Sequence, residues 1–90
     1  MSNNIGRRIR AVREAEGLSR EDFCAIIGLK VNTLTQIETG RTKNPASDTP
    51  QAVCTAFPQY TLWLMTEQVN PEGGQISPEI KLQADQLKTG

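Results

Sequence analysis

Apolar residues recur every three or four positions along most of the chain, and this spacing predicts a series of short helices. The first such stretch contains Ile5, Ile9 and Val12 and reaches Glu16 about one turn later. It predicts a helix over residues 5–16 with a narrow apolar face. Gly17 follows directly, and glycine readily ends a helix in the left-handed conformation.

The next two predicted helices are short and closely spaced. Ser19 and Asp22 resemble a capping box, so a second helix should begin after Ser19 and end at Gly28. A third helix is predicted over residues 31–39. The residues expected to face the core from these two helices are Phe23, Cys24, Ile26, Ile27, Leu34 and Ile37.

The second half of the chain continues the helical pattern. Helices are predicted over residues 48–57 and 59–65, separated by Pro58, and an amphipathic segment begins at Ser77 after a loop over residues 70–74. No alternating strand pattern persists. The predicted class is therefore all-α, a compact bundle of five or six short helices, depending on whether the last segment folds as a helix of the bundle.

The predicted third helix has one continuous polar face. Asn32, Thr35, Gln36 and Thr39 follow the spacing i, i+3, i+4 and i+7 and carry no full charge. Two short helices joined by a tight glycine turn form a known DNA-binding arrangement, and side-chain amides hydrogen-bond bidentately to adenine in the major groove. The ordinary alternative is a solvent-facing polar helix that binds nothing.

Charge distribution supports the first interpretation, although the formal net charge is zero. Residues 1–45 carry eight Lys and Arg against five Asp and Glu, a net +3, whereas residues 46–90 carry two against five, a net −3. Binding to phosphates requires a local positive patch and not a basic total. The first half of this single 90-residue domain is therefore the expected binding half.

Composition argues against chemistry beyond binding. The chain has no histidine, and no catalytic or metal-ligating constellation is visible, so we expect no enzyme activity, no metal, no cofactor and no small-molecule ligand. Cys24 and Cys54 are expected to be packed thiols, with a redox-sensing disulfide between them as the alternative. Without a long apolar run or a signal sequence, the expected location is the cytoplasm.

One family pattern accounts for these features. Residues 5–45 resemble the phage-repressor type of helix-turn-helix domain, the XRE-like family of lambda-like repressors and Cro proteins, through the stretches IGRRIRAVREAEGLS, GLSREDFCAIIGL and IETGRTKNP. The resemblance extends more loosely to the fourth and fifth helices. It implies a lambda-repressor-like fold and a transcriptional regulator, a repressor, that binds double-stranded DNA.

The resemblance also implies roles for individual residues. Base-reading contacts fall on Val31, Asn32 and Gln36, with Thr35 beside them. Phosphate contacts fall on Arg20, Thr39, Arg41, Lys43 and Asn44. Arg13 and Glu38 match a structural ion pair that holds the recognition helix in register.

Two positions depart from the family pattern. Lys30 stands where a Ser or Thr usually caps the recognition helix, and a lysine there is expected to reach a phosphate or a guanine edge. Val31 replaces a more usual polar residue. Two interpretations of Val31 stay open: packing against the inner face of the helix, or apolar contact with a thymine methyl group.

We expect residues 1–66 to form the helix-turn-helix domain and residues 67–90 to be a loop and helix that extend it. Leu62, Trp63, Met65 and the last helix provide more apolar surface than closing the domain requires, which suggests a homodimer. A symmetric dimer would hold two recognition helices about 34 Å apart on a roughly palindromic operator. Two alternative functions are the DNA-binding antitoxin of a toxin–antitoxin pair and a helical protein–protein interaction module.

Overall fold

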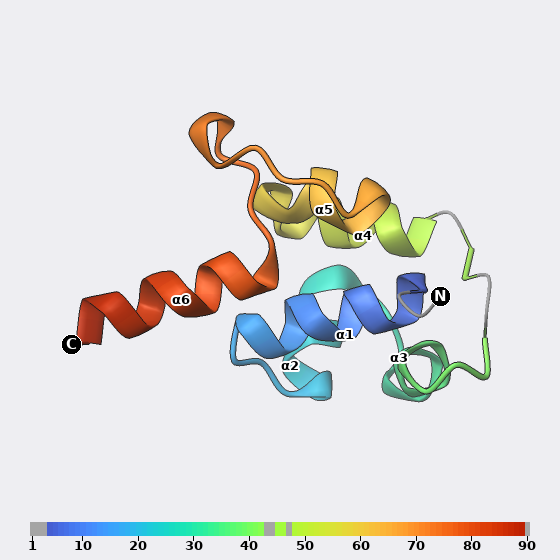
Figure 1. The fold of residues 1–90 in the computed structure, drawn as a ribbon. Coiled ribbons are helices and arrows are strands. Elements are labelled where there is room, and N and C mark those ends of the chain that lie inside the picture. The colour runs from blue at the N-terminus through green and yellow to red at the C-terminus, as the bar shows by residue number, and fades with distance from the viewer. Residues whose placement is uncertain (1–3, 43–44, 47, 90) are drawn as a thin grey trace.

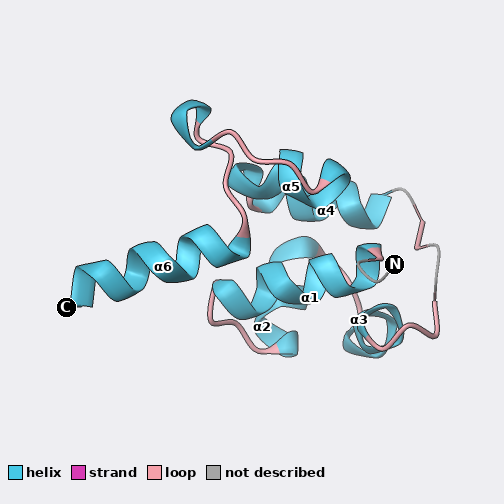
Figure 2. Ribbon diagram, in the orientation of Figure 1, coloured by secondary structure: helices cyan, strands magenta, loops and turns pink. Residues whose placement is uncertain are grey.

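The computed structural model describes residues 4–42, 45–46 and 48–89, and the regular structure in this part of the chain is helical (Figure 2). The α-helices are α1 (Ile5–Ala15), α2 (Arg20–Ile27), α3 (Val31–Glu38), α4 (Asp48–Ala56), α5 (Thr61–Thr66) and α6 (Pro78–Thr89). Two 3-10 turns, η1 (Pro58–Tyr60) and η2 (Pro71–Gly73), complete the described elements. The predicted all-α class is confirmed, and the helices lie within about two residues of their expected bounds.

Two local differences from the predicted elements begin at proline. The predicted helix over residues 59–65 begins as the 3-10 turn η1 before α5, and the predicted loop over residues 70–74 contains the 3-10 turn η2. Pro58 and Pro71 are the first residues of these turns. Proline has the φ angle of a first helical turn but lacks the N–H that a continuing helix needs.

Polar residues cap the first two helices. The Asn4 side chain accepts a hydrogen bond from the Arg7 backbone N–H at 2.9 Å. Ser19 Oγ accepts one from the Asp22 backbone N–H at 3.1 Å, as the capping pattern predicts. Both α1 and α2 therefore begin at a residue whose side chain accepts a backbone hydrogen bond. These caps define the first residue of each helix.

Helix α1 lies in the middle of the molecule (Figure 1). It contacts α3 on one side, and α4 and α5 on the other, while α2 packs on both α3 and α4. Phe23 and Phe57 stack in the core with ring centroids 5.6 Å apart. The core cluster consists of Ile9, Val12, Phe23, Cys24, Leu34, Ile37, Val53, Phe57, Tyr60 and Leu64. The prediction that Ile26 faces the core is wrong, because this side chain is 51% exposed on the outer side of α2.

The backbones of α1 and α3 come into direct contact at Gly6. A Cβ atom at this position would lie 2.1 Å from the carbonyl oxygen of Ile37, closer than real side chains approach. Gly6 is buried, and a hydrogen atom in place of a side chain permits this approach. The contact fixes the distance between α1 and the C-terminal end of α3.

Polar contacts join the C-terminal half to α1. The fully buried Tyr60 donates from Oη to the Glu16 carboxylate at 2.6 Å, and burial together with this hydrogen bond raises the pKa of Tyr60. Arg8 donates from Nε to the Leu64 carbonyl oxygen at 2.7 Å and pairs with Glu67 at 3.0 Å. Glu16, at the end of the predicted apolar face, therefore accepts a hydrogen bond from the core.

The link to α6 is ordered by a glutamine side chain. The amide of Gln75 accepts from the Leu62 backbone N–H at 2.9 Å and donates to the Pro58 carbonyl oxygen at 3.0 Å. Beyond it, α6 packs on α1, and its C-terminal end extends away from the other helices (Figure 1). The outer part of α6 is therefore presented to solvent, with Leu87 83% exposed.

Three further properties concern the described residues as a whole. No helix in these ranges has the length and apolarity needed to cross a membrane. No group of three metal-binding side chains comes together within the same ranges. Cys24 and Cys54 are free thiols, and burial raises the pKa of Cys24.

Gly6→Ala is expected to lower the free energy of unfolding by about 1–3 kcal/mol, the usual cost of adding a group to a packed contact. A decrease in the free energy of unfolding is informative, because alanine is favoured over glycine inside a helix by about 1 kcal/mol when nothing obstructs the added methyl group. Urea denaturation followed by far-UV circular dichroism measures the difference.

Gln51→Ala is the control for this substitution, since Gln51 is exposed on α4. It should change the free energy of unfolding by less than about 0.5 kcal/mol. A Gly6→Ala protein as stable as the wild type would contradict the direct backbone contact between α1 and α3.

Candidate nucleic-acid interface

A tight turn centred on Gly28 joins α2 to α3. Gly28 adopts the left-handed conformation at φ 75° and ψ 37°, where other residues are strained. The backbone N–H groups of Gly28 and Leu29 both donate to the Cys24 carbonyl oxygen, at 2.8 and 3.1 Å. Cys24 is only 4% exposed, and its small side chain suits the close approach of α2 to its neighbours. The helix–turn–helix predicted from these residues is present.

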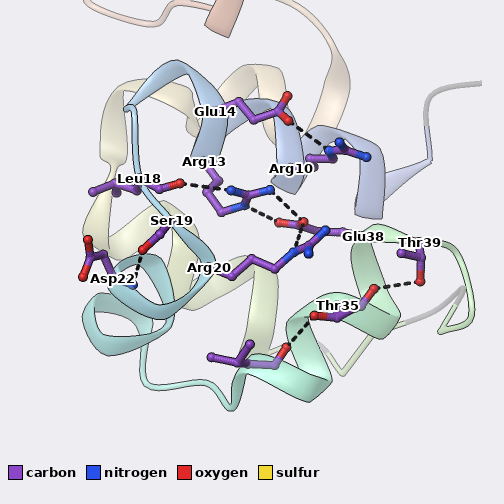
Figure 3. A network of polar contacts seen from close by, with 11 residues as sticks. Arg10, Arg13, Glu14, Leu18, Ser19, Arg20, Asp22, Thr35, Glu38 and Thr39 are labelled. Atoms are coloured by element: carbon purple, nitrogen blue, oxygen red, sulfur yellow. Dashed lines mark hydrogen bonds and ion pairs between the residues drawn. The ribbon is translucent and has the colours of Figure 1, made fainter.

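One face of α3 presents polar side chains to solvent. Asn32, Gln36 and Thr39 are exposed, and neither amide has a hydrogen-bond partner among the described residues. The threonine hydroxyls donate within the helix, from Thr35 to the Val31 carbonyl at 3.0 Å and from Thr39 to the Thr35 carbonyl at 2.8 Å (Figure 3). The two amides are therefore the groups on this face with uncommitted hydrogen-bond donors.

The start of α3 lacks a side-chain cap. Lys30 occupies the N-cap position in an extended conformation and makes no capping hydrogen bond, as its departure from Ser or Thr predicts. Val31 follows with 37% of its surface exposed. Part of this side chain is therefore accessible at the surface.

A buried carboxylate holds the inner side of α3 (Figure 3). The Glu38 side chain has 0% exposure. Arg13 on α1 donates to it from Nε at 2.8 Å and from Nη2 at 3.0 Å, and Arg13 Nη1 donates to the Leu18 carbonyl oxygen at 3.0 Å. The hydrogen bond to Glu38 raises the pKa of Arg13. The ion pair implied by the family resemblance therefore exists, in the bidentate geometry that binds most strongly.

Arg20 on α2 also binds Glu38. Its Nε donates to Glu38 Oε1 at 3.0 Å, and this oxygen also accepts the hydrogen bond from Arg13 Nη2. The Arg20 side chain keeps 34% of its surface exposed, compared with 11% for Arg13. Arg20 was expected to project toward DNA phosphates, and the structure places it at the surface end of a buried charge network.

Three other residues predicted to contact phosphate lie around the two ends of α3. Lys30 precedes the helix, and Thr39 and Arg41 follow it, and all three are exposed. Lys43 and Asn44 lie outside the described residues. The exposed cations at both ends of α3 therefore flank the polar face that carries the amides.

A cleft of about 400 Å³ opens beside the N-terminal half of α3, where α1, α2 and α3 meet. Arg10, one of its lining residues, pairs with Glu14 at 3.0 Å, and both members of that pair are half exposed. The residues lining the cleft are Arg10, Arg13, Arg20, Glu21, Val31 and Thr35. Guanidinium groups from α1 and α2 therefore lie next to Val31 and Thr35 of α3.

Two contacts that position α3 were not apparent from the sequence. The approach of Gly6 to Ile37 leaves one signal, a glycine inside an otherwise helical pattern, which often marks close packing. The contact between Arg20 and Glu38 leaves none, because it depends on the angle at which α2 meets α3. Both contacts act on the C-terminal end of α3.

Comparison with known proteins agrees with this geometry. A family described as a helix-turn-helix domain matches residues 4–57, which span α1 to α4. The chain is also similar to Repressor protein C of Escherichia phage P2, with 40% identity over 86 residues. That similarity covers 89% of this chain and 82% of the phage protein.

Glu38→Ala is expected to lower the free energy of unfolding by about 3–5 kcal/mol, because it leaves the buried guanidinium of Arg13 without its anion. Thermal and urea denaturation monitored by circular dichroism measure the loss. A change below about 1 kcal/mol would show that the buried pair does not hold α3 in place.

Glu14→Ala is the matched control. It also removes the glutamate partner of an arginine on α1, in this case Arg10. The Arg10–Glu14 pair is half exposed. Its loss should change stability by less than about 0.5 kcal/mol, the usual value of a surface pair in a helix.

Proposed function

The chain belongs to the helix-turn-helix domain family of DNA-binding transcriptional regulators, and we propose that it represses transcription by occupying a specific double-stranded DNA sequence. One observation carries the proposal: α3 presents the uncommitted amides of Asn32 and Gln36 on an exposed face. A helix of this kind fits the major groove, where base edges are distinguishable.

Base reading would come from the exposed face of α3. Asn32 and Gln36 each have the donor and acceptor that bidentate recognition of adenine requires. Thr35 donates its hydroxyl hydrogen within the helix, so it offers a methyl group and an acceptor oxygen. Val31 adds an exposed apolar surface suited to a thymine methyl group.

Affinity would come from contacts to the DNA backbone. Lys30 and Arg41 flank α3, and Arg20 lies at the cleft beside it. We assign the same role to Thr39, Lys43 and Asn44 on the family pattern. Contacts of this kind position the protein without reading sequence, and they make binding weaken as salt rises.

Repression is favoured over the other functions by the similarity to a phage protein whose name is Repressor protein C. That similarity extends over most of both chains. Neither an antitoxin role nor a purely protein-binding role gains comparable support. Occupancy of an operator needs no catalysis.

A homodimer would follow from the apolar surface of the C-terminal half. Met65, Val69, Leu82 and Leu87 are between 41% and 83% exposed. A second copy covering this surface would pair two recognition helices, and two-fold symmetry calls for inverted half-sites about 34 Å apart. The division of the chain into a helix-turn-helix domain, residues 1–66, and a dimerising extension, residues 67–90, is part of this proposal.

Gln36→Ala is expected to relax preference at one base position by about 1–3 kcal/mol, because one bidentate contact is lost. Selection of binding sites from random oligonucleotides by wild type and variant measures the change. An unaltered preferred sequence would overturn the assignment of Gln36 to base reading.

Gln51→Ala is again the control, because it removes the same side-chain amide from an exposed position on α4. It should select the wild-type sequence with wild-type affinity. The same selection reports half-site arrangement, and a single unrepeated site or a direct repeat would contradict the symmetric dimer.

Leu87→Lys is expected to weaken dimerisation by tenfold or more, about 1.4 kcal/mol, because it places a charge in an apolar contact. Sedimentation of the full chain over a concentration series measures the dimer dissociation constant. Ile26→Lys, at an apolar position 51% exposed on α2, should leave that constant unchanged. A wild-type monomer at high concentration, with and without operator DNA, would rule out the dimer.

A further inference from the structure

We propose that Arg8 holds the end of α5 in a strained turn and thereby positions Met65 and Val69 for contact with a second copy of this chain. The inference rests on the dimer proposed above and assigns part of its joining surface. It gives one residue of α1 a role in dimerisation and not in reading DNA. Arg8 acts as a positioning residue, since its side chain is largely buried, with 14% of its surface exposed.

The turn that ends α5 has a backbone conformation that usually requires glycine. Glu67 follows the helix with φ 64° and ψ 17°. Among the residues that the structure describes, it is the one non-glycine residue with a positive φ angle. A residue with a Cβ atom is disfavoured in this left-handed region and stays there only where the surrounding structure holds it. Contacts with other residues must therefore maintain the turn.

Arg8 supplies such contacts from α1. Its Nε donates to the Leu64 carbonyl oxygen at 2.7 Å, and its Nη1 donates to the Glu67 carboxylate at 3.0 Å. The last carbonyls of a helix have no partner inside it. Those of the two residues before Leu64 accept from Thr66 Oγ and from the Glu67 N–H, both at 2.7 Å. One guanidinium therefore completes the end of α5 and also binds the residue in the strained conformation.

Two exposed apolar side chains lie on either side of this turn. Met65 comes two residues before Glu67 and is 54% exposed, and Val69 comes two residues after it and is 41% exposed. The φ and ψ angles of Glu67 decide the direction in which the chain continues. A turn relaxed to negative φ would carry Val69 to another place. Arg8 therefore governs how the two apolar side chains lie relative to each other.

The chain after Val69 is anchored as well. Asn70 and Gln75 form an antiparallel bridge with N–H···O distances of 2.8 and 2.9 Å. The Gln75 side chain binds backbone groups of α5 and η1. The segment from Glu67 to Gln75 is thus fixed at both ends, with Val69 inside it. An apolar surface fixed in this way loses little conformational entropy on binding.

Charge favours a second copy as the partner. A symmetric dimer brings the same patch of each copy together, so the patch must be compatible with itself. The C-terminal half of the chain is acidic, and two like charges meeting at an interface would repel. Residues 61–70 contain a single charged residue, Glu67, and Arg8 neutralises it. The surface around Met65 and Val69 is therefore apolar and balanced in charge, as contact with an identical surface requires.

Arg8→Lys tests the directed contacts separately from the charge. A lysine keeps the positive charge but lacks the planar fork with which Arg8 binds two acceptors. Sedimentation of the full chain over a concentration series should show the dimer dissociation constant raised about tenfold or more. Arg10→Lys is the matched control on the same helix, because the Arg10–Glu14 pair is half exposed, and it should leave the constant unchanged.

Glu67→Gly separates positioning from stability. Glycine adopts the left-handed conformation without strain, but it lacks the carboxylate that Arg8 binds and leaves the turn free to vary. The free energy of unfolding, measured at concentrations where both proteins are monomeric, should stay close to that of the wild type. The dimer dissociation constant should nevertheless rise as for Arg8→Lys. Lower stability with unchanged dimerisation would reduce the contact to a structural one and overturn the inference.

Val69→Lys tests the surface itself. It would place an unpaired charge against the second copy, so the dimer dissociation constant should rise about tenfold or more. Thr55→Lys, at an exposed position of α4, is the control and should leave the constant unchanged. A Val69→Lys protein that dimerises like the wild type would show that this surface is not part of the interface.

The outcomes separate this inference from the proposed function. If the wild type dimerises and Arg8→Lys has the same dissociation constant, the role of Arg8 is wrong while the dimer and DNA recognition stand. If circular dichroism shows that Arg8→Lys does not fold, Glu67→Gly decides. A wild type that is monomeric at every concentration would overturn the proposed dimer and this inference with it. Failure of the wild type to select any DNA sequence would overturn DNA binding alone.

Discussion

The carboxylate of Glu38 is buried, and α1, α2 and α3 are arranged so that two arginines balance its negative charge. An isolated charge in such a place would destabilise the fold by several kcal/mol, roughly the stability of a small domain. Arg13 from α1 and Arg20 from α2 meet it at the end of α3. Hydrophobic burial has no preferred direction, whereas these hydrogen bonds do. The ion-pair network therefore sets the orientation of α3 as well as its burial.

Gly6 complements that network by fixing a distance. Its contact with the Ile37 backbone lies next to Glu38 in the sequence, so the C-terminal end of α3 is held at two adjacent residues. The opposite end begins at Lys30 without a side-chain cap and with Val31 exposed. α3 is thus anchored at one end and open at the other.

The features that depend on local sequence were predictable, and those that depend on how helices meet were not. Capping by Ser19, the turn at Gly28 and the polar spacing of α3 each involve neighbours along the chain. Glu16 shows the limit: the pattern placed a carboxylate on an apolar face, and its partner, Tyr60, lies 44 residues away. The second arginine on Glu38 likewise depends on the crossing of α2 and α3, which no spacing encodes.

The central place of α1 has a consequence for DNA spacing. This helix contacts α3 on one side and α4 and α5 on the other, through packed and hydrogen-bonded contacts at both, and α6 also packs on it. In a dimer joined through the C-terminal half, no flexible linker would separate the joining surface from the reading surface. Such a protein would tolerate little variation in spacer length between half-sites, since one added base pair also rotates the second site around the duplex.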